Sequence, residues 1–223
     1  YIVDGTLYIG EGRDIEIAVP STKTYTAQVL LGYILSMYFA SHLIGKKDHI
    51  LINDFKNILN TPHLVKQSIK EIKNNSEIKK ISSIPCKYNS WFIVRSNTSN
   101  AVCADEIRIK YSENCYEAVP SFSVEEINYI RPKKSFITMI IEDNYSDVKM
   151  NILKLLNNRN HLILICTNKI FDKDLNKFIK NKFLNIIIMP KAAEYFSYIP
   201  TIIAGQYLSY YLAVSIDKRK NYF

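Results

Sequence analysis

The sequence lacks the cysteine and histidine patterns that hold metal ions or mark a disulfide-rich secreted domain. It has four cysteines, at Cys86, Cys103, Cys115 and Cys166. They form no CxxC pair and are accompanied by no histidine cluster, and two of them lie in apolar runs typical of buried free thiols. We therefore expect a reduced, cytoplasmic protein that needs no metal and no organic cofactor.

Long runs of like charge are also missing, as is a signal peptide with a basic start and a cleavage site. The formal net charge of +8 comes mainly from scattered lysines. The basic runs are short and far apart, at Lys79-Lys80, Lys133-Lys134 and Lys218-Arg219-Lys220. Such runs are typical of solvated faces, so we expect no nucleic-acid partner, although a basic protein suits a phosphorylated substrate.

One uncharged segment, residues 24–44, is long enough to span a bilayer. It carries polar residues along its length, however, and Gly32 lies at its middle. We predict instead a helix over residues 22–44 that is buried on nearly all sides of a globular domain, with no membrane contact. Ser21 is a good N-cap for this helix, because its hydroxyl can accept a hydrogen bond from an otherwise unpaired backbone N–H.

The next part of the chain has two more helical patterns, at residues 49–59 and 62–73. The second opens with Thr61 and Pro62, which is typical of a helix start. Residues 74–85 are polar and contain serine and proline, so they are the best candidate for a linker between domains.

From residue 88 onward, short apolar runs alternate with amphipathic helical patterns. The runs lie at residues 91–95, 135–141, 161–166 and 184–189, and the last three are separated by the helical patterns 146–157 and 172–182. This alternation predicts a parallel sheet with helices on both faces. In such sheets ligands bind beyond the carboxyl ends of the strands.

A further helix, beginning near Ala101, carries Glu106, Lys110 and Glu113. Offsets of four and seven residues place these three charges on one face. A lysine between two carboxylates lowers their pKa values, unless burial opposes it. Two interpretations remain open at this point: a solvated ladder of salt bridges, and a functional site.

Three segments resemble a known family, in the same order along the chain. Glu16-Ile-Ala-Val-Pro-Ser-Thr-Lys23 resembles the Glu-Ile-x-Val-x-Ser-Thr-Lys motif of glucosamine–fructose-6-phosphate aminotransferases, whose isomerase half is built from sugar isomerase (SIS) domains. The stretch from Glu106 to Tyr116 resembles the family's Glu-Gly-Ala-Leu-Lys-Leu-Lys-Glu-x-x-Tyr helix. Gln206, Tyr210 and Ala213 match its last helix, although these residues also suit a simple packing helix.

The resemblance implies a fold and a domain organisation. We expect an α/β protein: a parallel-sheet SIS domain, flavodoxin-like with helices on both faces, over residues 85–223. The C-terminal part of a first SIS domain, with a helical connection, would precede it over residues 1–84. The chain is then expected to be a piece of a longer polypeptide that pairs into a homodimer.

The resemblance also implies an activity, the amination and isomerisation of fructose 6-phosphate to glucosamine 6-phosphate, with glutamine as the nitrogen source. Glu113 would be the general base and Lys110 its electrostatic partner. The phosphorylated sugar would be bound by a further set of residues: Val19, Ser21, Lys23, Ser96, Thr98, Glu106 and Tyr129. Ser21 would act through its hydroxyl or through the helix start, which favours anions.

The sequence departs from the family pattern in several places. Tyr129 stands where the family has the histidine that opens the sugar ring, and a tyrosine with a reference pKa near 10 is a poor acid–base group at neutral pH. The family's terminal Schiff-base lysine and its Ser/Thr-rich phosphate loop have no match here, and Arg95-Ser96-Asn97 replaces a glycine-containing loop. Two other functions therefore stay open: another SIS isomerase or deglycase, and a non-catalytic domain that senses a sugar phosphate.

Overall fold

The computed structural model describes residues 5–10, 16, 19–44, 49–96, 100–141, 145–167 and 181–220. The chain divides into two compact units, Tyr1–Pro62 and His63–Phe223. The division between the units differs from the expected boundary between SIS domains at residues 84 and 85, which stays a prediction.

The first unit is built on helix α1 (Lys23–Ile44) and the first part of helix α2 (His49–Asn74). The Tyr33 hydroxyl donates to Asp54 Oδ2 at 3.0 Å and links the two helices. A groove of about 470 Å³ lies between them, lined mainly by apolar residues such as Met37 and Phe55.

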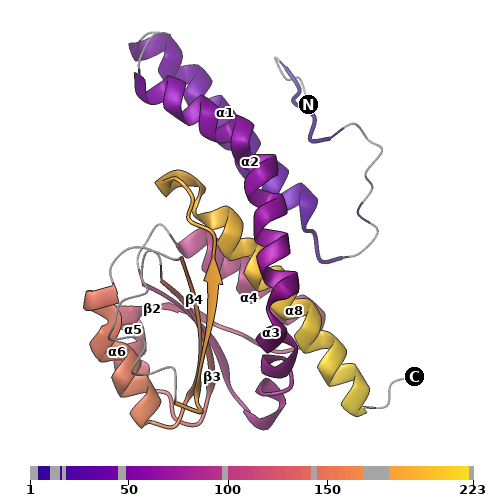
Figure 1. The fold of residues 1–223 in the computed structure, drawn as a ribbon, viewed down its shortest axis with the longest axis vertical. Helices are drawn as coiled ribbons and strands as arrows, with labels where there is room; N and C mark the ends of the chain where they lie inside the picture. The colour runs from indigo at the N-terminus through magenta and orange to yellow at the C-terminus, as the bar shows by residue number, and fades with distance from the viewer. Residues whose placement is uncertain are drawn as a thin grey trace. The chain divides into compact units, whose positions relative to one another are not determined.

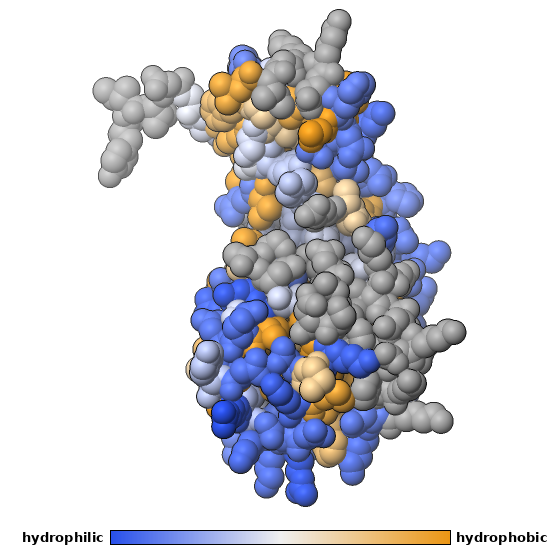
Figure 2. Space-filling view, turned by 90° about the vertical axis from the view of Figure 1, so that its left-hand side faces the viewer, coloured by the Kyte–Doolittle hydropathy of each residue, from blue (hydrophilic) through white to orange (hydrophobic). Residues whose placement is uncertain are grey.

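The expected burial of α1 on nearly all sides is wrong. None of its described side chains is buried, and Leu43 is 85% exposed. The physical reason is that two paired helices bury only the stripes that face each other. Exposed apolar residues of these helices are among those drawn orange in Figure 2.

Helix α2 continues through Pro62, so the prediction of two separate helices is wrong. Pro62 lacks an N–H and its ring crowds the carbonyl four residues earlier, but the other hydrogen bonds of this 26-residue helix remain. The Thr61 hydroxyl, expected to cap a new helix, instead donates to the Asn57 carbonyl at 3.3 Å. The helix therefore runs across the proline.

The second unit contains a five-stranded parallel sheet, as predicted, in the order β2-β1-β3-β4-β5. Its strands are β1 (Trp91–Arg95), β2 (Ser121–Ser123), β3 (Phe136–Ile141), β4 (His161–Thr167) and β5 (Leu184–Met189). Every residue of β3 and β4 is buried, as the continuous apolar runs require. Strand β2 is only three residues long and was not predicted from the sequence.

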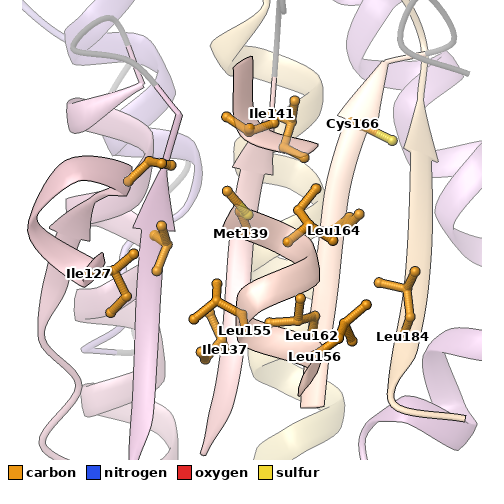
Figure 3. Close-up of a cluster of buried hydrophobic side chains, with 14 residues drawn as sticks. Ile127, Ile137, Met139, Ile141, Leu155, Leu156, Leu162, Leu164, Cys166 and Leu184 are labelled. Carbon is orange, nitrogen blue, oxygen red and sulfur yellow. The ribbon is translucent and has the colours of Figure 1, made fainter. Parts of the chain in front are cut away.

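Helices cover both faces of this sheet (Figure 1). On one face lie α5 (Val124–Ile130) and α6 (Tyr145–Asn157), and their apolar side chains meet alternate residues of the strands. Figure 3 shows this cluster, in which Leu155 and Leu156 of α6 lie against Ile137 and Leu162.

The other face carries α4 (Ala101–Cys115) and α8 (Tyr198–Lys220), which pack closely on each other. Alone among the described helices, α8 is long and apolar enough to cross a membrane. It is 61% buried over residues Tyr198–Asp217, so it is a core helix. Cys103, Cys115 and Cys166 are buried free thiols, whereas the apolar runs indicated this state for two of the four cysteines.

The segment expected to be a linker contains helix α3 (Ser76–Ile81) and a 3-10 turn, Pro85–Lys87. Ile78 and Ile81 are completely buried, and α3 contacts α8 and β5. A second 3-10 turn, Glu194–Phe196, precedes α8. The predicted helix 172–182 lies almost wholly outside the described residues.

Candidate active site

Lys110 lies between two carboxylates on helix α4. Its Nζ is 2.9 Å from Glu113 Oε2 and 3.2 Å from Glu106 Oε1. The helix dictates this arrangement, because residues three and four positions apart are neighbours on its surface. The three residues therefore form one cluster, as their spacing predicted.

The cluster is not a solvated ladder of salt bridges. Lys110 is 3% exposed and Glu106 is 7% exposed, whereas the Glu113 side chain keeps 27% of its surface accessible. Burial raises the pKa of the Glu106 carboxyl, and the Lys110 ammonium only partly opposes this effect. The nearby Glu113 charge raises that pKa further.

Because their exposures differ, a ligand can reach the carboxylate of Glu113 but not that of Glu106. Glu106 is enclosed beside Lys110, while Glu113 can meet a ligand with Lys110 at its side. A positioned carboxylate of this kind can remove a proton from carbon, and a neighbouring ammonium can stabilise enolate-like charge. Among the described residues, no group of three histidine, cysteine or acidic side chains is placed to hold a metal ion.

Helix α8 supports this part of α4 through contacts that were not predicted from the sequence. A side chain at Gly205 would place its Cβ 2.3 Å from Ile107 Cγ1, so only glycine allows the two helices to lie this close. Ser209 Oγ donates to the Lys110 carbonyl at 2.7 Å and accepts from Asn114 Nδ2 at 2.7 Å. A glycine inside an apolar helix was the only signal of this contact.

At the start of α1, the cap expected from Ser21 is supplied by Glu16. The Glu16 carboxylate accepts from the backbone N–H of Thr22 at 2.8 Å and of Lys23 at 2.6 Å. The Ser21 hydroxyl donates to the same carboxylate at 2.7 Å. A charged carboxylate is a stronger acceptor than a hydroxyl, which explains the exchange of roles.

These hydrogen bonds change the titration of Glu16. Its slight burial would by itself raise the pKa of the carboxyl, but the bonds from Thr24, Ser21, Thr22 and Lys23 together hold that pKa well below its usual range. A sugar phosphate could use the donors at this helix start only by displacing Glu16. The predicted roles of Ser21 and Lys23 therefore stay predictions, as does that of Val19, which is 83% exposed.

Two other predicted substrate residues lie away from Glu113. Ser96 follows β1 at the carboxyl edge of the sheet, and α4 rises about 18 Å between Ala101 and Glu113. Tyr129 is 88% exposed on α5, which covers the opposite face of the sheet from α4 (Figure 1). Thr98 lies outside the described residues. Within one chain, the second unit thus brings together Glu106, Lys110 and Glu113, without Ser96 or Tyr129.

No family model matches the sequence. Similarity is found to glutamine–fructose-6-phosphate aminotransferase (isomerizing) of Fusobacterium nucleatum, with 23% identity over 98% of this chain and 35% of that protein. The chain spans about a third of the length of the curated relatives it matches.

Solved structures have the same fold. The C-terminal domain of glucosamine–fructose-6-phosphate aminotransferase from Francisella tularensis matches with a TM-score of 0.75 and 20% identity, over 91% of this chain and 56% of that one. An Escherichia coli CFT073 protein in complex with a sugar phosphate matches with a TM-score of 0.56 and 12% identity, over 79% of this chain and 95% of that one.

The fold is that of an α/β protein of the sugar isomerase (SIS) class. Within this class, the chain is distantly related to the C-terminal, isomerase region of the glucosamine–fructose-6-phosphate aminotransferases. This relation confirms the resemblance that the Glu16–Lys23 and Glu106–Tyr116 segments indicated.

Proposed function

We propose that this chain is the isomerase region of a longer enzyme that binds fructose 6-phosphate and moves a proton between C1 and C2. With ammonia from glutamine, the longer enzyme would form glucosamine 6-phosphate. Glu113 is the general base, and Lys110 stabilises the charge that develops on the sugar. By resemblance to the family, the active form is a homodimer.

The buried pairing of Lys110 with an accessible Glu113 carries this proposal. A lysine that is 3% exposed serves no purpose of solubility, and its desolvation is costly. The arrangement leaves the carboxylate of Glu113 open on one side while the ammonium fixes the other. A sugar phosphate is the expected ligand because the related proteins act on fructose 6-phosphate, and the Escherichia coli protein of the same fold is found with a sugar phosphate.

The test is a product assay of the full-length parent protein with fructose 6-phosphate and ammonium, which replaces the nitrogen that glutamine would supply. Formation of glucosamine 6-phosphate and of glucose 6-phosphate is followed by NMR. We expect Glu113→Gln to lower the rate by about 10²- to 10⁴-fold, because the amide cannot accept a proton from carbon.

Glu117→Gln is the matched control, since Glu117 is an exposed carboxyl just beyond the same helix. It is expected to keep the wild-type rate. Product formation at the full rate in Glu113→Gln, or none in the wild-type protein, would contradict the enzymatic proposal.

A second candidate function is a non-catalytic sensor of sugar phosphates. The observation that favours it is Tyr129, which replaces the expected histidine and is exposed on the far face of the sheet. Calorimetric titration with fructose 6-phosphate separates the two functions. Saturable binding without turnover would identify the sensor.

A further inference from the structure

Glu113 occupies a part of α4 that needs support from outside the helix. The helix ends at Cys115, and Tyr116 follows in the left-handed conformation with a φ of 57°. Helix ends lack intrahelical partners and fray readily. The Tyr116 N–H donates to the Ser112 carbonyl at 3.0 Å, so the last turn around Glu113 is closed by one hydrogen bond at its end and gains further support only from outside the helix.

Ser209 of α8 supplies this support. Its hydroxyl donates to the carbonyl of Lys110 and accepts from the side chain of Asn114, at 2.7 Å in each case. These two residues lie on either side of Glu113 in the sequence, one helical turn apart. Ser209 is completely buried, so water does not compete with these bonds.

The short serine side chain can reach the backbone of α4 only because the two helices lie close together. Gly205 lies one turn before Ser209 on the same helix. Because it has no Cβ, the Ile107 side chain can occupy that space and the helices can approach closely. The approach at Ile107 and the hydrogen bond at Lys110 are spaced by three residues on α4, so they act on the same side of that helix.

We infer that Ser209 is a positioning residue for the Lys110–Glu113 pair. It fixes the rotation of the last turn of α4 and so holds Glu113 Oε2 at 2.9 Å from Lys110 Nζ. The inference rests on the proposed function in assigning a reaction to this pair. The hydrogen bonds themselves are independent of it.

The experiment compares Ser209→Ala with Ser209→Cys in the product assay. Misplacement of a reacting group by about 1 Å can lower a rate by about 100-fold. We expect Ser209→Ala to lower kcat by about 10- to 100-fold with little change in KM. Ser209→Cys, which keeps a weak donor on a somewhat larger side chain, should recover part of the loss.

Two variants of α8 serve as controls. Ser215→Ala removes a hydroxyl from a half-buried position on the same helix, and is expected to keep the wild-type kcat. Ile216→Val removes one buried methyl group from the same helix and is the control for a general loss of stability. If Ile216→Val lowers kcat as much as Ser209→Ala, or if Ser209→Ala keeps the wild-type kcat while Glu113→Gln does not, the inference is wrong.

Amide hydrogen exchange separates this inference from the proposed function. If Glu113→Gln does not change the rate of product formation, the proposed reaction is wrong. The structural role of Ser209 is then tested by amide hydrogen exchange alone. Ser209→Ala should then speed exchange of the amides of Glu113–Tyr116 more than those earlier in α4. Equal protection of these amides in Ser209→Ala and in the wild-type protein would overturn the inference.

Discussion

Glu106 occupies the least favourable environment of the three charged residues on α4, because it is nearly enclosed and shares its only described cation with Glu113. Its carboxyl has a raised pKa, first through desolvation and then through the charge of Glu113. Removing a charge from water costs free energy that a shared ion pair repays only in part. The residue should therefore weaken the folded state whenever it is ionised.

The direction of the pH effect follows from the raised pKa. Below pH 4.5, the ordinary value of the carboxyl, both the folded and unfolded chains keep the proton. As the pH rises further, the unfolded chain releases the proton first, so stability falls until the pH passes the raised pKa of the folded state. We predict that the stability of the wild-type protein relative to Glu106→Gln falls over this window, by at most about 1.4 kcal/mol per pH unit.

Urea denaturation at a series of pH values above about 4 measures this difference. Glu117→Gln is again the control, and an exposed substitution of this kind should change stability by no more than about 0.5 kcal/mol. If the stability of the wild-type protein relative to Glu106→Gln stays constant or rises with pH, burial does not destabilise the ionised form of Glu106.

The spacing of Glu106, Lys110 and Glu113 was readable from the sequence, but their burial was not. Helical geometry is local, so four- and seven-residue offsets place the three on one face whatever surrounds them. Burial depends on the packing of distant segments, such as the contact of Ser209 with Lys110 across 99 residues of sequence. A sequence without aligned relatives carries no direct signal of such a pair.

Among the elements, α4 and α8 pack on each other in the second unit, and their approach at Ile107 depends on one glycine. We predict that Gly205→Ala destabilises the protein by about 1 to 3 kcal/mol, because its Cβ would lie 2.3 Å and 2.6 Å from two carbons of Ile107. Thermal or urea denaturation measures the change. Shortening the opposing side chain in the double variant Gly205→Ala/Ile107→Ala should relieve the clash.

The chain offers a matched control in Gly32, which lies in the middle of α1, where an added Cβ would meet no atom within 4 Å. Gly32→Ala should stabilise its helix by about 0.5 to 1 kcal/mol, since alanine loses less backbone entropy on folding than glycine. If both substitutions change stability in the same direction, the close approach at Ile107 does not govern the effect of Gly205→Ala.

The elements were predictable where one physical signal dominated them. Buried parallel strands need continuous apolar runs, and β1, β3, β4 and β5 all show them. Strand β2 has only three residues, too few to show a hydrophobic periodicity in the sequence, and it is defined by its pairing with β1. Pro62 was predicted to start a new helix, but it lies inside a 26-residue helix. The hydrogen bonds on either side outweigh the one that the missing N–H removes.

At the scale of the whole molecule, the two units differ sharply in how they bury apolar residues. The second unit encloses a five-stranded sheet between helices, with a continuous core on the α5–α6 face. The first unit consists mainly of two helices and leaves Phe39, Leu43, Ile50 and Leu59 more than 60% exposed. Two helices alone cannot enclose a core, so the first unit has little stability of its own.

This difference predicts the behaviour of fragments divided at the boundary between the units. A fragment of residues 63–223 should unfold cooperatively in urea, because it retains every described strand and both layers of helices. A fragment of residues 1–62 should show weak helical circular dichroism and no cooperative transition. The cut falls inside α2 and leaves the first N–H groups of the remaining helix without intrahelical partners, so the new helix start at residue 63 should fray while the sheet keeps its fold.

The same fragments test which unit binds the phosphate of the sugar. Fragment 63–223 retains Glu106, Lys110, Glu113 and Ser209, while Ser21 and Lys23 lie in the fragment that is removed. If the residues of the first unit bind the phosphate, fragment 63–223 keeps its fold but loses affinity for fructose 6-phosphate in calorimetric titration. Unchanged affinity would place phosphate binding within the second unit. Loss of the cooperative transition in 63–223 would instead show that the first unit is required for its stability.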